Sequence, residues 1–266
     1  MGKYNWKEAV VIVTGASSGI GRATSLRLAQ AGAFLALAAR RQAELETLAR
    51  EIRSLGSEAI VLPTDVTFQE QVQSLVQAVL QRWGRVDVLV SNAGQYVRAP
   101  ITEMSIATLE HSMAVNFYAG VFAIQAVLPH MLEHRKGHIV LVSSTDVKTA
   151  IPPDAPYVAA KCALSGFGDI LRQELCGSGV EVTTIYPGRI DTPMIENIRV
   201  PRISAKITPE TVARVIQSGV ERRKAEVFIP ANTRLFYMIN VFFPRTCDWL
   251  TRKLGISGKE LSSLEK

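Results

Sequence analysis

A chain of 266 residues with 47% hydrophobic and 20% charged residues has the size and composition of one large globular domain. The net charge of +6 comes without a nucleic-acid-binding motif or a clustered basic helix, so we expect no nucleic acid partner. The three cysteines lack metal-ligand spacing and the N-terminus lacks a long apolar stretch, so we expect no metal site, no structural disulfide and a cytoplasmic location.

The first predicted element is a strand over residues 9–13, where five apolar residues, mostly β-branched, indicate burial on both faces. Residues 15–21 have the spacing Gly-x-x-x-Gly-x-Gly, and a helix pattern follows and ends at Gly32. Such a turn binds phosphate because unpaired N–H groups and the positive end of the helix dipole face the anion. Taken alone, the pattern also fits a tight strand-to-helix turn without a ligand.

The rest of the chain alternates strands and helices. Further strands are predicted over residues 34–38, 59–62, 86–90, 138–143, 180–186 and 227–229, and helices over 45–55, 72–80, 105–134, 156–176 and from 209 onward. Nearly all-apolar strands separated by helices indicate a parallel sheet covered on both faces. We therefore predict one doubly wound, Rossmann-type α/β domain of about seven strands over residues 1–230, and a hydrophobic helical extension over 231–266 that is not an independent domain.

Polar and glycine residues follow these strands where a doubly wound sheet binds its ligands, at the carboxyl ends of the strands. They are Thr14-Gly15, Ala39-Arg40, Asp65, Asn92, Ser143-Ser144 and Pro187-Gly188. Packing alone does not explain polar residues at every strand end. The pattern therefore favours a nucleotide site along this edge.

Tyr157 and Lys161 are four residues apart in a predicted helix, so a phenol and an ammonium group share one helix face. A tyrosine with its ordinary pKa of about 10 is a poor acid or base near neutrality. A neighbouring cation stabilises the phenolate and lowers that pKa, which makes proton exchange with a substrate oxygen feasible. The spacing alone also fits an ordinary surface pair, but here it follows Ser144 by thirteen positions.

These motifs together resemble the short-chain dehydrogenase/reductase family, in the group with Thr-Gly-x-x-x-Gly-Ile-Gly and Tyr-x-x-x-Lys. The similarity extends over residues 6–230. It rests on the 14–21 loop, Asn92-Ala93-Gly94, Asn116, Ser144, Tyr157, Lys161 and Pro187-Gly188 with Thr192. The resemblance implies an oxidoreductase that transfers a hydride between a nicotinamide cofactor and a carbonyl or secondary alcohol.

The family implies a role for each matching residue. Tyr157 would give or take the proton, Ser144 would polarise the substrate oxygen, and Lys161 would hold the nicotinamide ribose and tune Tyr157. Asn116 would bend its helix and position water for a proton relay. The other residues expected to contact the cofactor are Gly15, Ser17, Ser18, Gly19, Ile20, Gly21, Asp65, Val66, Asn92, Ala93, Gly94, Pro187, Gly188, Ile190 and Thr192.

The residues after the second strand bear on the choice of cofactor. An acidic side chain there binds the ribose 2′-OH of NAD and repels a 2′-phosphate, but this chain has Ala39 followed by Arg40 and Arg41. Guanidinium groups suit phosphate in charge and geometry. We therefore expect NADP(H) rather than NAD(H), with Arg40 as the main contact and Ser17 as a helper. The alternative is two surface arginines at a helix start.

Two positions bear on the substrate. Asp146 stands where the family often has a small residue or glycine, and it either contacts the substrate or caps its loop. Arg189 either meets an anionic group of the substrate or lies in solvent. We expect an apolar, lipid- or steroid-like substrate, with further pocket walls from Val97, Ile151, Pro153, Met194, Ile195 and Ile198.

The C-terminal part contains the most hydrophobic stretch, residues 235–243, followed by an apolar stripe among basic residues up to Leu254. This stretch is too short to span a bilayer, which takes about 20 apolar residues. Three interpretations are open for residues 234–254: a lid over the substrate pocket, a subunit interface, or a helix lying on an anionic membrane.

Two expectations concern the protein as a whole. We expect a homodimer or homotetramer. The alternative to an enzyme is a catalytically idle nucleotide-binding scaffold, against which the complete set of Asn116, Ser144, Tyr157 and Lys161 argues.

Overall fold

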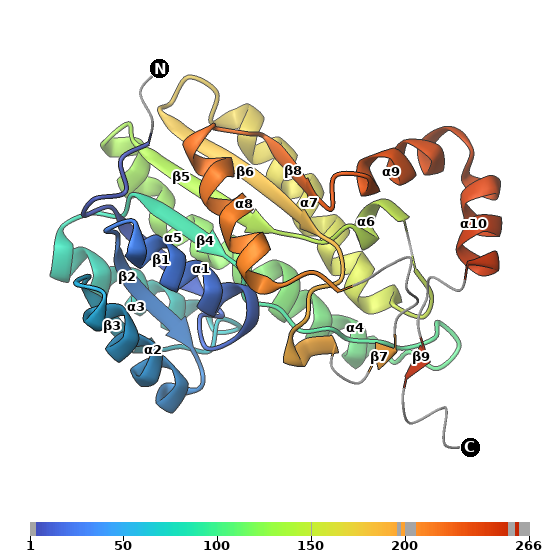
Figure 1. Cartoon of the computed structure of the whole chain (residues 1–266), viewed down its shortest axis with the longest axis horizontal. Coiled ribbons are helices and arrows are strands. Elements are labelled where there is room, and N and C mark those ends of the chain that lie inside the picture. The colour runs from blue at the N-terminus through green and yellow to red at the C-terminus, as the bar shows by residue number, and fades with distance from the viewer. Residues whose placement is uncertain (1–3, 150, 196–197, 200–205, 255–258, 261–266) are drawn as a thin grey trace.

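The computed structural model describes residues 4–149, 151–195, 198–199, 206–254 and 259–260. Its centre is a parallel sheet of seven strands between layers of helices (Figure 1). The strands are β1 (Val10–Thr14), β2 (Phe34–Ala39), β3 (Ala59–Pro63), β4 (Val88–Ser91), β5 (Gly137–Val142), β6 (Val180–Pro187) and β8 (Glu226–Ile229). Their order, β3-β2-β1-β4-β5-β6-β8, is that of a doubly wound sheet and confirms the predicted fold.

Helices cover both faces of the sheet. On one face lie α1 (Gly19–Gln30), α2 (Gln42–Ser54) and α8 (Pro209–Glu221), and on the other α3 (Gln69–Trp83), α5 (Ala119–Glu133) and α7 (Ala155–Glu174). Smaller elements are α4 (Ile106–Met113), α6 (Asp146–Thr149), the 3-10 helix η2 (Pro193–Ile195), and the antiparallel pair β7 (Ile198–Arg199) and β9 (Lys259–Glu260). Strand limits differ from the predicted ones by only one or two residues.

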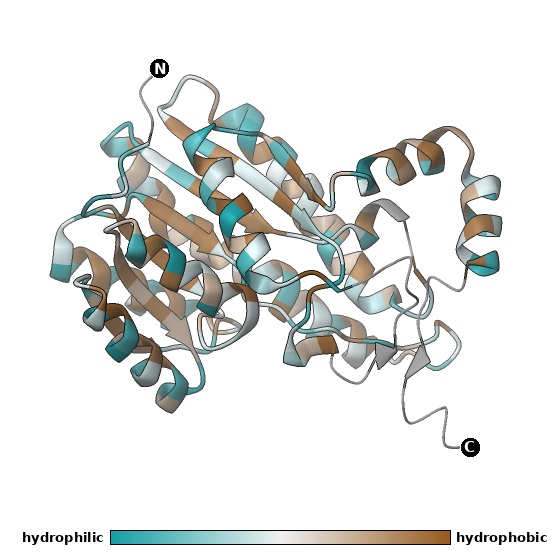
Figure 2. Cartoon of the chain, viewed as in Figure 1, coloured by the Kyte–Doolittle hydropathy of each residue, from teal (hydrophilic) through white to brown (hydrophobic). Residues whose placement is uncertain are grey.

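The strands are apolar throughout because each one contributes side chains to the hydrophobic cores on both faces of the sheet. Side chains of a strand alternate between its faces, so Val11 and Val13 of β1 pack beneath α1 and α8, while Val10 and Ile12 pack on the opposite side. All four are fully buried. Figure 2 shows the strands as mainly apolar bands between helices whose outer faces are hydrophilic. This two-sided burial is the property that the composition of the strands predicts.

The helix predicted over residues 105–134 forms in three parts. Between α4 and α5 the chain makes a π-helical turn, η1 (Ala114–Tyr118), which contains Asn116. Such turns are rare and occur frequently at functional sites. Among the described residues, Ile106–Glu133 is also the one helical stretch that is long and apolar enough to cross a bilayer, by length and composition only. Its buried side chains include Ala123, Ile124, Val127 and Met131, which pack in the core.

The C-terminal part contains α8 and two further helices. The side chain of Thr208 accepts a hydrogen bond from the N–H of Thr211, and Pro209 is the first residue of α8. The C-terminal extension forms two helices, α9 (Thr233–Phe242) and α10 (Pro244–Lys253). Both helices project from one end of the sheet domain (Figure 1).

His138 in β5 makes the stability of the sheet sensitive to pH. Its ring is buried and bonded to Thr183 Oγ1 at 2.8 Å. Burial, aided by the positive charge of Arg223, lowers the pKa of His138 from its ordinary value of 6.5 to about 4. Because the unfolded chain binds this proton more readily than the folded chain, the contribution of His138 to stability falls as the pH drops from 6.5 to about 4.

We therefore expect His138→Gln to resist acid better than the parent protein. The difference in unfolding free energy between the two should change by about 1.4 kcal/mol for each pH unit in that window, in favour of the variant. Urea denaturation at several pH values measures this difference. The exposed His134→Gln is the control. Unfolding free energies of parent and His138→Gln that run parallel across the window would contradict the prediction.

Candidate active site

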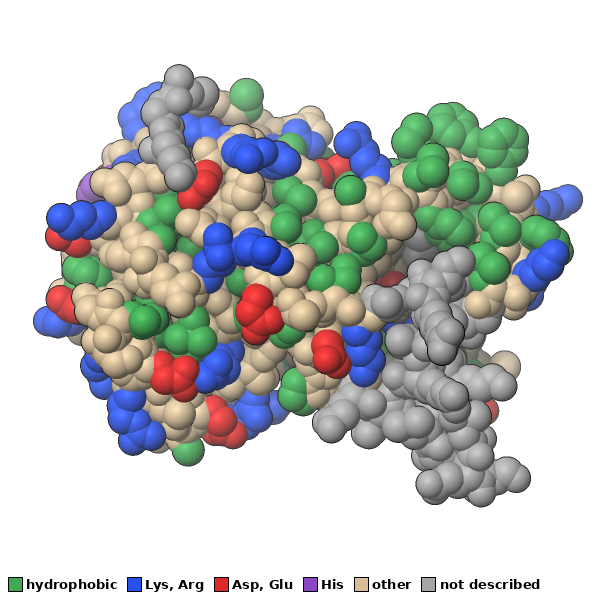
Figure 3. All heavy atoms as spheres, in the orientation of Figure 1, with side chains coloured by type: hydrophobic (Ala, Val, Ile, Leu, Met, Phe, Trp, Pro, Cys, Tyr) green, Lys and Arg blue, Asp and Glu red, His purple; other side chains and the backbone are tan. Residues whose placement is uncertain are grey.

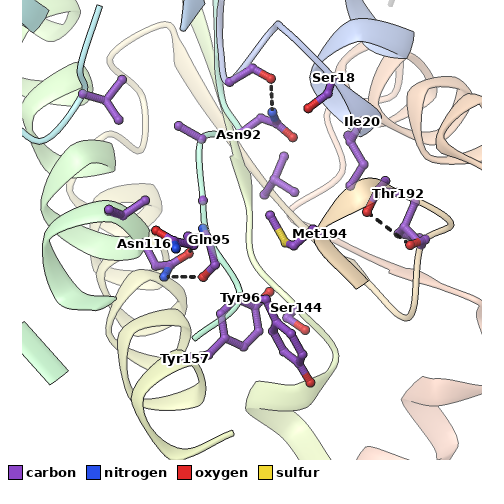
Figure 4. Close-up of a pocket in the computed structure, with 18 of the residues that line it drawn as sticks. Ser18, Ile20, Asn92, Gln95, Tyr96, Asn116, Ser144, Tyr157, Thr192 and Met194 are labelled. Atoms are coloured by element: carbon purple, nitrogen blue, oxygen red, sulfur yellow. Dashed lines mark hydrogen bonds between the residues drawn. The ribbon is translucent and has the colours of Figure 1, made fainter. Parts of the chain in front are cut away.

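A cavity of about 490 Å³ opens at the carboxyl ends of the strands, where the strand order reverses between β1 and β4. All four residues expected to be catalytic line it: Asn116, Ser144, Tyr157 and Lys161. Of the residues expected to contact the cofactor, only Gly21 is absent from the wall. Figure 4 shows Asn116, Ser144 and Tyr157 on one side and Thr192 and Met194 on the other.

The glycine loop between β1 and α1 is held in place by the end of β4. The backbone N–H groups of Asn92 and Ala93 donate to Thr14 Oγ1 at 3.0 and 3.1 Å, and Asn92 Nδ2 donates to the Thr14 carbonyl at 2.9 Å. Gly15 and Gly19 have φ values of +67° and +53°, a region that favours glycine. The loop is therefore rigidly shaped by contacts with the neighbouring strand.

The start of α1 has the properties of an anion site. Ser18 is the N-cap, but its side chain makes no capping hydrogen bond, and the first turn has no acidic residue. The N–H groups of this turn and the positive end of the helix dipole are therefore available to a phosphate. Ser18 and Ile20 are among the residues that line the cavity (Figure 4).

Gly21 lies behind the residues that line the cavity. A Cβ atom at this position would collide with the carbonyl oxygen of Gly15 and would lie 2.7 Å from Asn92 Nδ2. The absence of a side chain lets α1 approach the loop, and so Gly21 shapes the site without lining it.

Asn116 is tied to the segment that follows β4. Its Nδ2 donates to the carbonyl oxygens of Gln95 and Ser112 at 2.9 and 3.1 Å, and its Oδ1 accepts the N–H of Gln95 at 3.1 Å. Asn116 lies in the π-helical turn η1, so these bonds tie the turn to α4 and to the segment after β4 (Figure 4).

Tyr157 and Ser144 form the centre of the site. Both are buried, and the Ser144 hydroxyl is close enough to influence the pKa of Tyr157. Burial, and then the charge of Asp146, raise the pKa of Tyr157 above its ordinary value, and the Ser144 hydroxyl offsets this only in part. Within this chain, Tyr157 therefore keeps its proton at neutral pH.

This corrects the expectation that Lys161 lowers the pKa of Tyr157. Lys161 Nζ lies 5.9 Å from the centroid of the Tyr157 ring, but it donates a hydrogen bond to the Val142 carbonyl of β5 at 2.9 Å. The helical spacing brings the two residues together, and the strand carbonyl attracts the ammonium group. Burial lowers the pKa of Lys161 to about 8.

At the other end of the cavity, Arg40 and Arg41 follow β2. Arg41 Nη2 donates to Ser17 Oγ at 3.0 Å, and Arg41 Nη1 lies 3.5 Å from Glu44 Oε1. Arg40 is exposed and lines the cavity. Burial raises the pKa of nearby Asp65, but hydrogen bonds from Thr67 and the charge of Arg40 outweigh it and lower that pKa. In the structure Ser17 is therefore hydrogen-bonded to Arg41. The sequence predicts instead that Ser17 assists Arg40 in binding the cofactor.

Comparison with known proteins agrees with this site geometry. The family model for the short chain dehydrogenases matches residues 9–202. The chain belongs to the short-chain dehydrogenase family. The residues that match this family of oxidoreductases include the sheet strands β1 to β6, the glycine loop and the Tyr-x-x-x-Lys pair. The loop and the pair line the cavity.

Several relatives cover most of this short-chain dehydrogenase. An uncharacterized oxidoreductase of Listeria monocytogenes is 35% identical over 81% of this chain and 92% of its own length. A fatty acyl-CoA reductase of Acinetobacter baylyi is 32% identical over 85% and 77%, and the human dehydrogenase/reductase SDR family member 7 is 32% identical over 95% and 79%. A solved alcohol dehydrogenase of Thermococcus sibiricus, complexed with 5-hydroxy-NADP, has a TM-score of 0.76 at 27% identity and covers 83% and 95%.

Sequence reasoning missed a buried polar cluster beside Tyr157 in this short-chain dehydrogenase. The Tyr96 hydroxyl donates a short hydrogen bond to Asp154, and Arg98 Nε donates to the other carboxylate oxygen at 2.8 Å. The Tyr96 ring meets the Tyr157 ring edge-on, with centroids 4.9 Å apart (Figure 4). Tyr96 follows the Asn-Ala-Gly motif by two residues, and that position is the one signal that could have identified it.

Asp146 lines the cavity and is bonded to Ser144. Its N–H donates to Ser144 Oγ at 3.1 Å. Burial, and then the charge of Asp154, raise the pKa of Asp146 to about 6. The two interpretations of Asp146 are therefore not exclusive, because it opens α6 and also faces the cavity.

Only some of the residues expected to contact the substrate line the cavity. Arg189, Met194 and Ile195 line the cavity, as Asp146 does. Three others, Val97, Ile151 and Pro153, are not among the residues that line it. The segment after Tyr96 pairs with the segment before Asp154, through the Ala99 N–H and the Pro153 carbonyl at 3.0 Å, and Tyr96 lines the cavity instead. The side chain of Ile198 lies outside the described residues.

Proposed function

We propose that this chain is an NADP(H)-dependent oxidoreductase that interconverts a carbonyl and a secondary alcohol on an apolar substrate. The observation that carries the proposal is the convergence of Ser144, Tyr157, Lys161 and Asn116 on one wall of the cavity, below the glycine loop. An idle scaffold protein has no need for this arrangement. Family membership supports the reaction class, and the side chains of the chain support the finer assignment.

The residues present fit a dinucleotide. The glycine loop and the N–H groups of α1 would hold the pyrophosphate, and Asp65 and Val66 would flank the adenine. Ile190, Thr192 and Lys161 line the other end, where the nicotinamide and its ribose would lie. When bound, the nicotinamide supplies or accepts the hydride.

The proton is handled by the chain itself. Tyr157 is protonated at neutral pH, which is the state needed to deliver a proton from its Oη to the carbonyl oxygen of a substrate. Ser144 Oγ, within hydrogen-bonding reach of that hydroxyl, positions the same oxygen. Lys161 has a pKa near 8, so its ammonium group exchanges protons near neutral pH and is suited to help restore the Tyr157 proton.

The chemistry of the cavity supports an apolar substrate with a polar end. Met194 and Ile195 provide apolar wall, whereas Asp146 and Arg189 are charged groups near Tyr157. The similarity to a fatty acyl-CoA reductase supports a long acyl chain among the substrates to be tried first. A ketone carbonyl within an acyl chain would reach Tyr157 while the chain lies against Met194, and its reduction would give a secondary alcohol.

A cofactor-oxidation screen tests the proposed function. Purified protein is mixed with NADPH and a panel of aldehydes and ketones of increasing chain length, and the loss of absorbance at about 340 nm is recorded. We expect turnover that increases with the apolar length of the substrate. NADPH binding without turnover of any compound in either direction would favour the scaffold alternative and contradict the proposal.

The choice of cofactor has a test of its own. Arg40→Ala removes an exposed guanidinium at the end of β2, so NADPH binding should weaken by about 1–3 kcal/mol, the value of a hydrogen bond to a charged group. NADH, which lacks the 2′-phosphate, should bind as before. Titrating both cofactors measures the two affinities. Arg50→Ala, an exposed arginine of α2, is the control, and an equal loss for both cofactors in Arg40→Ala would count against this assignment.

A further inference from the structure

The two C-terminal helices form a projecting arm, defined here as Thr233–Lys253, that packs on the domain along one side only. Tyr237 stacks on Phe228 of β8 with ring centroids 6.3 Å apart, and α9 also contacts α6. In α10, Cys247 and Thr251 are buried, whereas no side chain of α9 is. The arm is therefore anchored on its inner side.

The outer side of the arm is apolar and exposed. Phe242 and Phe243, at the corner between the two helices, are 70% and 64% exposed. Leu235, Met238 and Val241 continue this surface along α9 at helical spacing, and Trp249 is exposed on α10. Figure 3 shows apolar side chains gathered over this end of the molecule. A contiguous apolar surface of this kind marks a contact with a protein or a membrane.

Basic residues border the apolar surface. Arg234, Arg245, Arg252 and Lys253 are exposed, and Asp248 is the one acidic residue of the arm. Within the part of the chain that the structure describes, none of the four basic side chains pairs with a carboxylate. Lys253 Nζ lies 4.6 Å from the centroid of the Trp249 ring. The positive charge of the arm is therefore available to an anionic partner.

We propose that the arm is a docking site for the surface of a bilayer with anionic headgroups. An aromatic and aliphatic face bordered by arginine and lysine is the composition of a helix that lies in the membrane interface. Each helix has ten residues, half of what a spanning helix needs, so the arm lies in the plane of the interface.

A second copy of the chain fits the arm less well. In a symmetric dimer the same surface of both chains meets, so one interface would gather the four basic residues and the one acidic residue of each arm. Like charges brought together oppose association. In a bilayer, anionic headgroups would pair with the basic residues of the arm, and the acyl region would bury its apolar surface. A membrane therefore accounts for both features.

Vesicle flotation with the full-length chain tests the proposal. The protein is mixed with vesicles of phosphatidylcholine alone or of phosphatidylcholine with phosphatidylserine. It should float with the phosphatidylserine vesicles and dissociate as salt rises from about 0.15 to about 1 M, where the screening length falls to about 3 Å. The tryptophan emission should shift to the blue on binding, because Trp249 is exposed on the arm, whereas Trp6 is buried and Trp83 is half-buried in α3.

Paired variants separate the two components of binding. The double change Phe242→Ser and Phe243→Ser should weaken binding to phosphatidylserine vesicles at least tenfold, because two large side chains no longer leave water. The changes Arg245→Gln and Arg252→Gln should weaken it about fivefold each, the contribution of a basic residue near an anionic surface. Matched controls are Phe68→Ser, at the exposed residue that precedes α3, and Arg50→Gln, at an exposed residue of α2.

Three outcomes overturn the proposal. The first is a chain that does not float with phosphatidylserine vesicles at low salt, and the second is one that floats equally with both vesicle types. The third is a dimer that becomes a monomer in the Phe242→Ser and Phe243→Ser variant on a sizing column, which would assign the surface to a second copy. NADPH binding by each variant verifies that it is folded, and the arginine variants keep the test decisive if the phenylalanine variant fails to fold.

Discussion

Replacement of Tyr157 by phenylalanine should lower the rate of carbonyl reduction by about 10²–10⁴-fold, the usual contribution of a positioned acid. The change removes only the hydroxyl and keeps the buried ring. The ring keeps its edge-on contact with Tyr96, at a centroid distance of 4.9 Å, so the fold and NADPH binding should survive. Turnover of the best substrate and a separate NADPH titration measure the two effects.

The control for this variant is Tyr118→Phe. Tyr118 is an exposed tyrosine of η1 that does not line the cavity, so loss of its hydroxyl should leave turnover unchanged. A Tyr157→Phe protein that works at the parent rate would remove Tyr157 from the mechanism. Equal losses in the two variants would indicate a general defect and not the loss of a proton donor.

The second large effect is expected at Gly21, where Gly21→Ala should weaken NADPH binding about ten- to a hundredfold. A Cβ atom would collide with the Gly15 carbonyl, so the loop that would hold the pyrophosphate must move. Overpacking of this kind costs about 1–3 kcal/mol. The melting temperature should fall as well, because the same loop is bonded to the end of β4 through Asn92.

Gly166→Ala in α7 is the matched control. A Cβ atom at Gly166 would have nothing within 4 Å, and alanine favours a helix over glycine by up to about 1 kcal/mol. This variant should bind NADPH normally and melt at the same or a higher temperature. If Gly21→Ala behaves in the same way, the close approach of α1 to the loop has no functional consequence. Calorimetry and cofactor titration on both variants decide the question.

The fold could be predicted because its determinants are local in the chain. Apolar β-branched runs, the capping pair Thr208-Pro209 and the glycines at Gly15 and Gly32 act through spacing and backbone conformation. These properties can be evaluated without knowing which segments meet. The alternation of strands and helices then leaves few topologies, and the observed strand order is the one expected.

Part of the site was predictable for a related reason. Parallel strands end at the same edge of a sheet, so residues such as Asn92 and Ser144 reach one cavity although they are far apart in sequence. The positions of Tyr157 and Lys161 on one helix face also follow from helical geometry. The sequence therefore determined which residues stand around the cavity, through rules that connect chain spacing to position.

Only the tertiary structure decided how those side chains are paired and charged. Lys161 bonds to a carbonyl of β5 contributed by another part of the chain, and burial raises the pKa of Tyr157 where the sequence suggested a fall. Likewise, the bond from Arg41 to Ser17 and the contact of Tyr96 with Asp154 join segments that no local pattern connects. A pKa and a hydrogen bond depend on the solvent and partners around an atom, and these exist only once distant segments have packed together.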